Sequence, residues 1–332
     1  MNHVAINTLK PNDQIVSVYY LDRLEIKKKR DGEDYAQLTV RDATGSLPAV
    51  MWEGLAAIQQ GSVRAESFVE IEGRIGQYRD QLQLVISSIR PVPLEEVDKQ
   101  PFLPVSPTPR QTLLAQLDET IAGVKDRDLK MLLVSIFQDD EDLRAKFAEA
   151  PSAMKMHQAY LGGLLEHTLK VLRVALSIAE HYPGYNRDLL VSATLLHDLG
   201  KIWEFEYETS IRYSDRGRLI GHIVLGIELV HEKIRAIGGM PEEKSVLLIH
   251  TILAHHGERE WGSPKRPKTL EALILHFADL LDSRLSTFME HKRLGQEQGR
   301  SWSEFIPIFD RAMYLAEAPS EAADDDNPLQ SS

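Results

Sequence analysis

The 332-residue chain contains no cysteine, and this absence restricts its chemistry. Without thiols the protein forms neither disulfide bonds nor thiolate metal sites, so any metal must be held by nitrogen and oxygen ligands. The sequence also lacks an uninterrupted apolar run near the ~20 residues that a membrane helix needs. Its start, MNHVAINTLKPNDQ, is not that of a signal peptide. We therefore expect a cytoplasmic protein that does not interact with a membrane.

Basic side chains are outnumbered, and a net charge of −12 argues against a nucleic-acid-binding surface spread over the whole molecule. The charge is, however, unevenly distributed. Residues 1–93 carry 11 basic and 12 acidic side chains, which is close to balance. Residues 317–332 add five acids and are typical of a disordered, solvated tail. The charge balance therefore leaves nucleic acid as a candidate partner for the N-terminal part.

Prolines are concentrated in one stretch, with six of the sixteen between Pro91 and Pro109. Proline fixes one backbone angle and lacks an N–H group, so this stretch is unsuited to a helix or a central strand. We predict a linker at residues 94–109. It separates an N-terminal domain at 1–93 from a C-terminal domain at 110–316, which the acidic tail at 317–332 follows.

The N-terminal domain has the alternating pattern of antiparallel strands. Residues 14–29 and 35–42 flank the turn sequence RDGED, and residues 46–52 follow the turn DATG. A short helical stretch at 54–61 precedes two further strands at 67–78 and 81–90. Three strands, a short helix and two strands is the order of an OB-fold, a small all-β barrel that commonly binds single strands.

An OB-fold usually holds its ligand at its loops, where cations follow the phosphates and aromatic rings stack on the bases. Each residue also has a simpler interpretation, because aromatics in a small barrel often belong to the core and a KKKR run is often a solvated hairpin. The candidates for nucleic-acid binding are Tyr20, Lys27, Lys28, Lys29, Arg30, Trp52, Tyr78 and Arg79.

After the linker, apolar residues recur at three- and four-residue spacing, which predicts an all-α domain. One apolar segment, residues 189–202, contains His197 and Asp198. Burying such a pair is costly unless something compensates, and a metal ion is the natural partner. Imidazoles and carboxylates ligate transition metals, and two adjacent metals suit phosphoryl transfer. Further candidate ligands in this domain are His167, His222, His255, His256 and Asp279.

The spacing H…HD…D resembles the HD-domain superfamily of metal-dependent phosphohydrolases. The motifs HDLGK, GHI, HHGEREWGSP and HFADLLDS occur in the expected order within residues 150–290. With an OB-fold in front, the whole chain resembles the YhaM-type 3′-to-5′ exoribonucleases. The resemblance implies that the OB domain grips single-stranded RNA or DNA. It also implies that the HD domain removes 5′-mononucleotides from the 3′ end, usually with manganese.

The resemblance further implies two divalent metals, and the nitrogen-rich ligand set favours Mn²⁺ or Fe²⁺ over Mg²⁺. Lys201 follows Asp198 by one helical turn, where its ammonium would neutralise a phosphate oxygen while a metal-activated water attacks phosphorus. Asp198 and Lys201 are therefore the predicted catalytic residues. The implied ligands are His167, His197, Asp198 and Asp279 for one metal, and Asp198, His222, His255 and His256 for the other.

Two parts of the ligand set stay open at this point. His222 could instead cap a helix after the turn SDRGRLIG, which would leave a one-metal site. Neighbours on a helix point about 100° apart, so one of His255 and His256 could ligate while the other contacts the phosphate. The sequence does not decide between these two histidines.

Other polar residues near the motifs have weaker assignments. His276 precedes Asp279 by three residues and is more typical of a surface or satisfied core histidine, whereas Asp282 could orient a ligand. Glu166 and Glu258 are candidate proton shuttles that an ordinary helix surface explains equally well.

The loop after the paired histidines distinguishes the chain from a related group. Cyclic-dinucleotide phosphodiesterases of the HD-GYP group carry Gly-Tyr-Pro at a comparable place, whereas this chain has Trp261-Gly262-Ser263-Pro264. The difference argues against cyclic di-GMP as the substrate. Lys265, Arg266 and Lys268 make the loop basic, either to hold outgoing phosphates or as a solvated surface.

Two other function classes remain alternatives at this point. One is a phosphohydrolase of nucleotides or cyclic dinucleotides with a regulatory OB domain, and the other is a non-catalytic nucleic-acid-binding protein with a structural metal. The completeness of the ligand set argues against the second. The apolar helices are compatible with a homo-oligomer without requiring one.

Overall fold

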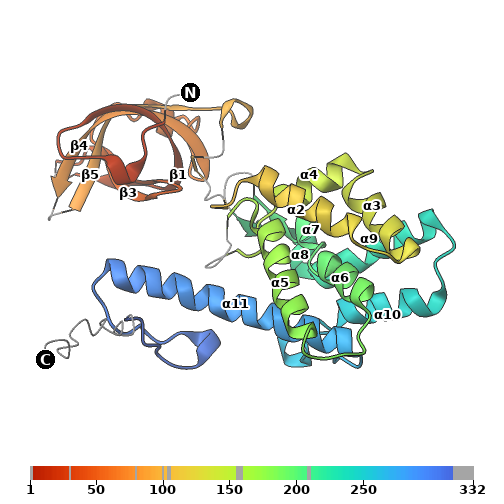
Figure 1. Ribbon diagram of the computed structural model, residues 1–332. Coiled ribbons are helices and arrows are strands. Elements are labelled where there is room, and N and C mark those ends of the chain that lie inside the picture. Colours follow the sequence, from red (N-terminus) through yellow and green to blue (C-terminus); the bar gives the residue numbers. More distant parts are fainter. Residues whose placement is uncertain are drawn as a thin grey trace, which may run out of the picture.

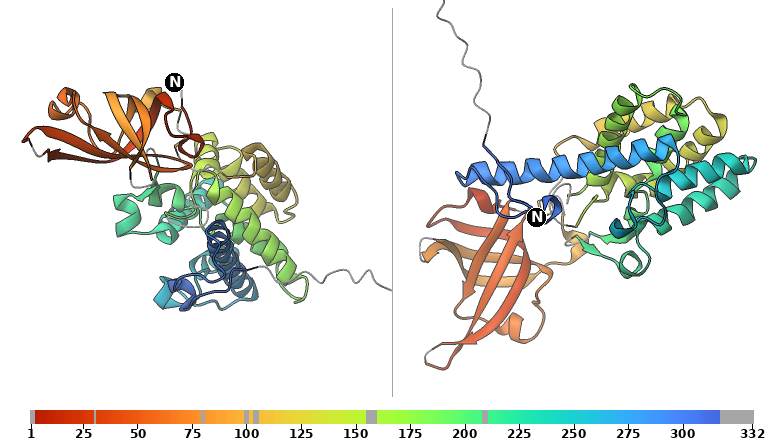
Figure 2. Two further views of the ribbon diagram at one scale, coloured as in Figure 1. Left: turned by 90° about the vertical axis from the view of Figure 1, so that its left-hand side faces the viewer. Right: turned by 90° about the horizontal axis from the view of Figure 1, so that it is seen from below.

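The computed structural model describes residues 3–29, 31–78, 81–98, 101–102, 106–154, 160–207 and 211–316. A β-barrel is followed by an α-helical domain (Figure 1), and in the view from below the end of the last long helix overlaps the barrel (Figure 2). The predicted fold class, an OB-fold barrel followed by an all-α domain, is confirmed. The predicted acidic tail at 317–332 lies outside the described residues, as do Arg30 and Arg79.

The barrel is closed by five strands in the spatial order β1-β2-β3-β5-β4. The strands are β1 (Gln14–Lys28), β2 (Asp34–Asp42), β3 (Gly45–Met51), β4 (Ser67–Tyr78) and β5 (Gln81–Pro91). The short helix α1 (Ala56–Gln59) lies between β3 and β4, as the sequence predicts. Only β3 and β5 pair in parallel, and this pairing joins the two ends of the sheet. Alternate apolar side chains fill the interior, among them Tyr19, Leu38 and Ile71.

A second, smaller apolar cluster lies beside the main barrel core. Val18 of β1 and Phe68 of β4 pack there with Val92 and with Phe102 from the proline-rich stretch. The backbone N–H of Ala43 also donates to the carbonyl of Pro101 at 2.9 Å. Part of the predicted linker therefore packs against the barrel.

The helical domain contains ten helices in the described part of the chain, several of them short. They are α2 (Arg110–Ala122), α3 (Arg127–Phe137), α4 (Glu141–Glu149), α5 (Gly163–Ala179), α6 (Arg187–Leu196), α7 (Lys201–Glu204), α8 (Asp215–Leu219), α9 (His222–Ile237), α10 (Glu242–Leu253) and α11 (Leu270–Glu297). A two-stranded hairpin, β6 (Phe205–Glu206) and β7 (Arg212–Tyr213), separates α7 from α8. None of the described helices is both long and apolar enough to cross a membrane.

Several helices begin at a residue whose side chain caps the first turn. Asp126 accepts from the backbone N–H groups of Asp128 and Leu129 before α3, and Asn186 accepts from that of Leu189 before α6. Such caps satisfy N–H groups that have no partner within the helix. They fix where α6 starts and hence where its last turn delivers His197.

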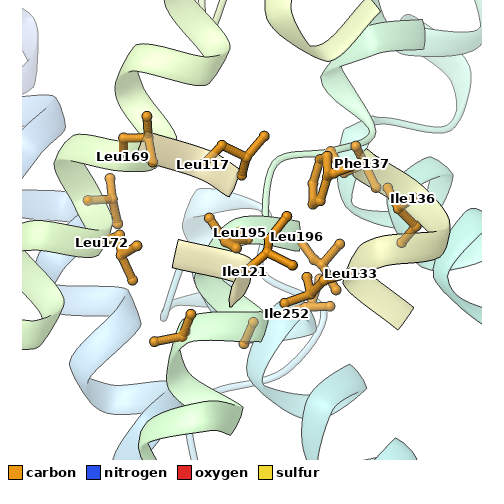
Figure 3. Packing of buried hydrophobic residues seen from close by; sticks show 14 of the residues in the cluster. Leu117, Ile121, Leu133, Ile136, Phe137, Leu169, Leu172, Leu195, Leu196 and Ile252 are labelled. Atoms are coloured by element: carbon orange, nitrogen blue, oxygen red, sulfur yellow. The ribbon is translucent and has the colours of Figure 1, made fainter. Parts of the chain in front are cut away.

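The helical core is formed by the apolar faces of helices that are distant in sequence. Leu117 and Ile121 of α2 lie near Leu196 of α6, with Leu133 of α3 and Ile252 of α10 on the other side (Figure 3). All five are buried. This packing holds the ends of α6 and α10 in place, and four of the predicted ligands follow those ends.

The structure corrects one detail of the predicted helices. The sequence pattern suggests that His197 and Asp198 lie within a single apolar helix, but α6 ends at Leu196 and α7 begins at Lys201. The pair therefore lies in the turn between the two helices. A Cβ at Gly200 would come within 1.9 Å of the His222 carbonyl, so a glycine is required for this turn to pack against α9.

The last long helix, α11, extends well beyond the other helices (Figure 1). After it the chain folds back in a hairpin, in which the N–H of Ser303 donates to the carbonyl of Met313 and that of Ile306 to Arg311. The tip of this hairpin is a short 3₁₀ helix, η4 (Pro307–Phe309). The guanidinium of Arg284 on α11 donates to the Ile308 carbonyl at 2.7 Å and holds the tip against the helix.

Candidate metal centre

Five separate elements deliver the predicted ligands to one place. His167 comes from α5, His222 from the first residue of α9, and Asp279 from the middle of α11. His197 and Asp198 follow α6, and His255 and His256 follow α10. The structure therefore brings all seven predicted metal ligands together, although they span more than a hundred residues.

Asp198 lies at the middle of this cluster, and its two carboxylate oxygens face different histidines. Oδ2 lies 3.3 Å from Nε2 of His167 and 3.3 Å from Nε2 of His197. Oδ1 lies 3.3 Å from Nε2 of His222 and 3.7 Å from Nε2 of His255. The Asp198 carboxylate therefore has one oxygen facing each of two sets of histidines.

The remaining ligand atoms form two groups, one on each side of Asp198. The first group is His167, His197 and Asp279, and the second is His222, His255 and His256. Within each group the candidate ligand atoms lie within 4.8 Å of one another. His222 therefore points into the centre as well as starting α9, and both adjacent histidines contribute to the second group.

Each ring is oriented by a hydrogen bond from its other nitrogen. Carbonyl and carboxylate oxygens only accept, so the Nδ1 atoms carry hydrogens and the Nε2 atoms are directed into the centre. The Nδ1 acceptors are Asp282 Oδ2 for His167, Thr194 O for His197, Glu204 Oε1 for His222, Ile252 O for His255 and Trp261 O for His256, at 2.7–3.0 Å.

The donor atoms at the centre fit a metal because several of them are buried without a partner. Nε2 of His197, His222 and His255 and Oδ1 of Asp198 have no hydrogen bond among the described residues. A buried polar atom without a partner costs about 1–3 kcal/mol, so four around one point would be a large penalty. Cations at the two groups would satisfy them, and imidazole nitrogens suit transition metals.

The carboxylates control the charge state of the first group. Burial alone would lower the pKa of His167, but Asp198, Asp279 and Asp282 outweigh it and raise that pKa well above its usual value. Burial would likewise raise the pKa of Asp198, but the charges of Lys201 and His197 and a hydrogen bond from His167 hold it well below its usual range. The Asp198 carboxylate is therefore ionised and available to a cation.

In the second group, the pKa values of two histidines are lowered instead of raised. Burial lowers the pKa of His255 well below its usual value, and the neighbouring His256 and His197 add to this effect. Burial and the charge of His222 also lower the pKa of His256. Both rings are therefore neutral near pH 7, which is the form that ligates a metal.

Lys201 contacts the centre directly. Its Nζ lies 2.7 Å from Oδ2 of Asp198, and the backbone N–H of Lys201 donates to the Asp198 carbonyl at 2.9 Å. Burial would lower the pKa of Lys201, but Asp198 raises it above the usual value, so the ammonium stays charged.

A pocket of about 470 Å³ opens onto the centre. Its floor includes His167, Asp198 and Lys201, and Trp261 and His276 form part of its wall. Pro307 and Ile308, at the tip of the C-terminal hairpin, line it as well. The pocket is therefore lined both by candidate metal ligands and by residues of the C-terminal hairpin.

The barrel surface agrees only in part with the predicted nucleic-acid contacts. Tyr20 is buried, because Phe68 packs edge-on against its ring and Arg41 lies over it at 4.3 Å. The prediction that Tyr20 stacks on a base is therefore wrong, since neither face of its ring is open. Trp52 and Tyr78 are exposed, and Lys27 and Lys28 are exposed at the end of β1.

Trp52 has an aromatic partner that the sequence did not indicate. Its ring stacks on Tyr35 with centroids 4.9 Å apart and an interplanar angle of 25°. Tyr35 is the register partner of Lys27, so the two rings lie next to exposed basic side chains. Lys29 is half-buried and pairs with Glu33 at 2.9 Å.

Models of known families match both parts of the chain. The HD domain matches residues 164–284, and the OB-fold nucleic acid binding domain matches residues 24–92. The chain is 33% identical over 310 residues to the 3′-5′ exoribonuclease YhaM of Listeria monocytogenes, covering 90% of this chain and 96% of that protein. The chain belongs to the YhaM family of 3′-5′ exoribonucleases.

A second YhaM, from Bacillus subtilis, is 32% identical over 257 residues, covering 77% of this chain and 80% of that protein. As a member of the YhaM family, the chain is a metal-dependent hydrolase of the HD superfamily with a nucleic-acid-binding OB-fold. The HD match includes all seven predicted ligands but ends at Arg284, so the C-terminal hairpin lies beyond it.

Sequence reasoning missed one group at the centre and assigned others in part. Glu204 was not identified, yet its Oε1 accepts from both the backbone N–H and Nδ1 of His222 at 3.1 and 3.0 Å. Asp282 orients His167, as its spacing from Asp279 suggested. The sequence around Glu204 gave no signal of this contact, because His222 lies eighteen residues further along the chain.

The two candidate proton shuttles are engaged elsewhere. Glu166 accepts from Ser106, Tyr160 and Lys170 at 2.6–2.8 Å and ties the proline-rich stretch to α5. Glu258 pairs with Arg266 at 2.8 Å on the surface of the loop. Their contacts explain both as structural residues.

Proposed function

We propose that this protein is a metal-dependent 3′-to-5′ exonuclease that shortens single-stranded RNA, and single-stranded DNA as well, to 5′-mononucleotides. The observation that supports this most directly is the position of Asp198, whose two oxygens face separate groups of buried histidines. Membership of the YhaM family supports the direction of the reaction.

The proposed cofactor is a pair of divalent ions, with Mn²⁺ or Fe²⁺ favoured over Mg²⁺ because the donors are mostly imidazole nitrogens. His167, His197 and Asp279 would hold one ion, His222, His255 and His256 the other, and Asp198 would contribute to both. When bound, such ions lower the pKa of water and neutralise charge on a phosphate.

Lys201 has a defined part in this proposal. Its ammonium stays charged at the pocket floor and is held at 2.7 Å by Asp198, so it is positioned for a phosphate oxygen without prior rearrangement. Fixed charge in a site shielded from water stabilises the charge that develops on phosphate more strongly than a mobile surface lysine would.

The barrel would supply affinity for the strand. Stacked Tyr35 and Trp52 offer a platform for a base, and the exposed Lys27 and Lys28 lie at the end of the neighbouring strand for phosphates. Neither contact distinguishes one base from another, which suits an enzyme that shortens a strand of any sequence.

The proposal is tested with a 5′-labelled single-stranded RNA, purified protein and Mn²⁺. We expect a ladder that shortens from the 3′ end, with 5′-mononucleotides as the product. A second reaction contains mononucleotides and cyclic di-GMP as competing small substrates. Turnover of these small nucleotides alone, with the RNA left intact, would contradict the proposal and favour a nucleotide phosphohydrolase.

A strand with an internal label and a 3′-terminal hairpin provides the control for single-strand specificity. The paired 3′ end should resist digestion, because the proposed enzyme acts on single strands. Cleavage within the strand would indicate an endonuclease instead.

A further inference from the structure

His276 lies in the wall of the metal pocket but belongs to neither group of candidate ligands. It is on α11, one turn before Asp279, and is buried with 7% of its surface exposed. Neither its position in the sequence nor the two-metal arrangement assigns it a role.

One hydrogen bond determines which nitrogen of the His276 ring donates. Nδ1 of His276 lies 2.8 Å from the backbone carbonyl of His255, which only accepts, so Nδ1 carries a hydrogen. In a neutral imidazole the other nitrogen, Nε2, is then an acceptor. The structure gives Nε2 no hydrogen-bond partner among the described residues, and it is not one of the fully buried unpartnered atoms.

The ring is also held firmly in place. A Cβ at Gly257 would lie 2.2–2.5 Å from three of its atoms, so the glycine backbone packs against the ring and no side chain fits there. The Trp261 ring lies 6.1 Å away and the Phe277 ring 5.0 Å away, centroid to centroid. An acceptor this well fixed is suited to recognising a particular donor.

The chemistry of the substrate limits what that donor can be. Phosphate oxygens only accept hydrogen bonds and do not complement an accepting Nε2. Base N–H groups differ among the four nucleotides, whereas the sugar hydroxyls next to the scissile phosphate occur on every one. Resting on the exonuclease function proposed above, we propose that His276 accepts a hydrogen bond from a hydroxyl of the 3′-terminal sugar and so recognises the free end of the strand.

The experiment uses four otherwise identical RNA oligonucleotides whose last nucleotide carries both hydroxyls, only the 3′-hydroxyl, only the 2′-hydroxyl, or neither. Single-turnover rates are measured for the wild type and for His276→Phe with Mn²⁺. We expect the wild type to remove the dideoxy end about tenfold more slowly, the effect of one lost hydrogen bond. The His276→Phe variant should remove the natural and the dideoxy 3′-terminal nucleotides at that same slower rate. The two oligonucleotides that lack a single hydroxyl identify which hydroxyl is recognised.

Two variants and one measurement separate recognition from structural support. His276→Gln keeps an acceptor and should retain part of the preference, and His231→Phe on the exposed face of α9 should behave as the wild type. Bound manganese should be unchanged in His276→Phe. Equal slowing of all four substrates, an unaltered preference or a loss of metal would each overturn the assignment. Failure of the wild type to shorten even the natural RNA would instead overturn the proposed function, and this assignment with it.

Discussion

Lys201 Nζ lies 2.7 Å from Oδ2 of Asp198, the same oxygen that faces His167 and His197. The lysine thus balances the carboxylate in a buried place and still lines the pocket. We predict that Lys201→Met lowers the single-turnover rate on RNA by about 10²-fold or more, because a fixed positive charge near the phosphate is lost. Bound metal should not decrease, since a competing cation is removed from Asp198.

The matched control is Lys146→Met, which removes an equivalent ion pair with Asp142 on the surface of α4. This control should leave the rate within twofold of the wild type, which is a change of about 0.4 kcal/mol in activation free energy. A Lys201→Met enzyme with the wild-type rate would exclude a role for the ammonium in the reaction.

Asp198→Asn should abolish metal binding and activity together. The substitution keeps the shape of the side chain but removes the charge that serves both groups. Manganese content and far-UV circular dichroism are measured on the same sample, with Asp142→Asn as the control. Because bound metal stabilises only the folded state, Mn²⁺ should raise the Tm of the wild type and a chelator should lower it. The Tm of Asp198→Asn should respond to neither, and a retained response would contradict the ligand assignment.

Glu204→Gln should weaken the second group selectively. Glu204 fixes the ring of His222 through Nδ1, and loss of such an orienting carboxylate typically costs ~10–100-fold in metal affinity. Titration with Mn²⁺ should show one unchanged and one weakened site. The control is Glu206→Gln, two residues after Glu204, which alters a surface ion pair with Arg212. Equal weakening of both sites would contradict the division into two groups.

Trp52→Ala should weaken binding of a single strand by about 1–3 kcal/mol, the usual contribution of one base stacked on an aromatic ring. Fluorescence anisotropy with a labelled oligonucleotide measures the effect. Tyr182→Ala, which removes an exposed ring from the helical domain, is the control. Hydrolysis of a small phosphodiester should be unaffected by Trp52→Ala, and a parallel loss there would indicate that the barrel acts on the metal centre.

The ion pair of Asp118 with Arg144 should make stability depend on pH. Two contacts of 2.7 and 2.8 Å join them, and the hydrogen bond from Arg144 lowers the pKa of Asp118. Because the pKa of Asp118 is lower in the folded protein, the ion pair stabilises the fold fully above the pKa of the unfolded chain, about 4. This stabilisation is lost as the pH falls through the pKa of Asp118 in the folded protein. The difference in unfolding free energy between wild type and Arg144→Gln should therefore shrink below about pH 4. In Asp118→Asn this pH-dependent part should be absent at every pH.

Much of the centre could be predicted because buried histidines and aspartates are conspicuous within apolar segments. Glu204 was not, since KIWEFEYE has the composition of an ordinary surface, and only the folded turn brings its carboxylate to His222. The place of His276 in the pocket also required the structure, because spacing on α11 does not reveal that the His255 carbonyl faces its ring.

The strands of the barrel followed from alternation and turn residues, but the roles of its aromatics did not. Tyr19 and Tyr20 are adjacent and both buried, the first in the barrel core and the second in the cluster with Phe68 and Phe102. That second cluster includes Phe102, which is more than eighty residues after Tyr20, so a local sequence pattern cannot reveal the contact. The stack of Tyr35 on Trp52 depends likewise on the register of two strands.

Asp279 reaches the centre from α11, whereas His167 comes from α5, so the ligands are complete only when almost the entire helical domain has been synthesised. A growing polypeptide on the ribosome that has not yet exposed α11 lacks one carboxylate and the pocket wall beside it. The two groups of candidate ligands therefore come together only late in the synthesis of the chain.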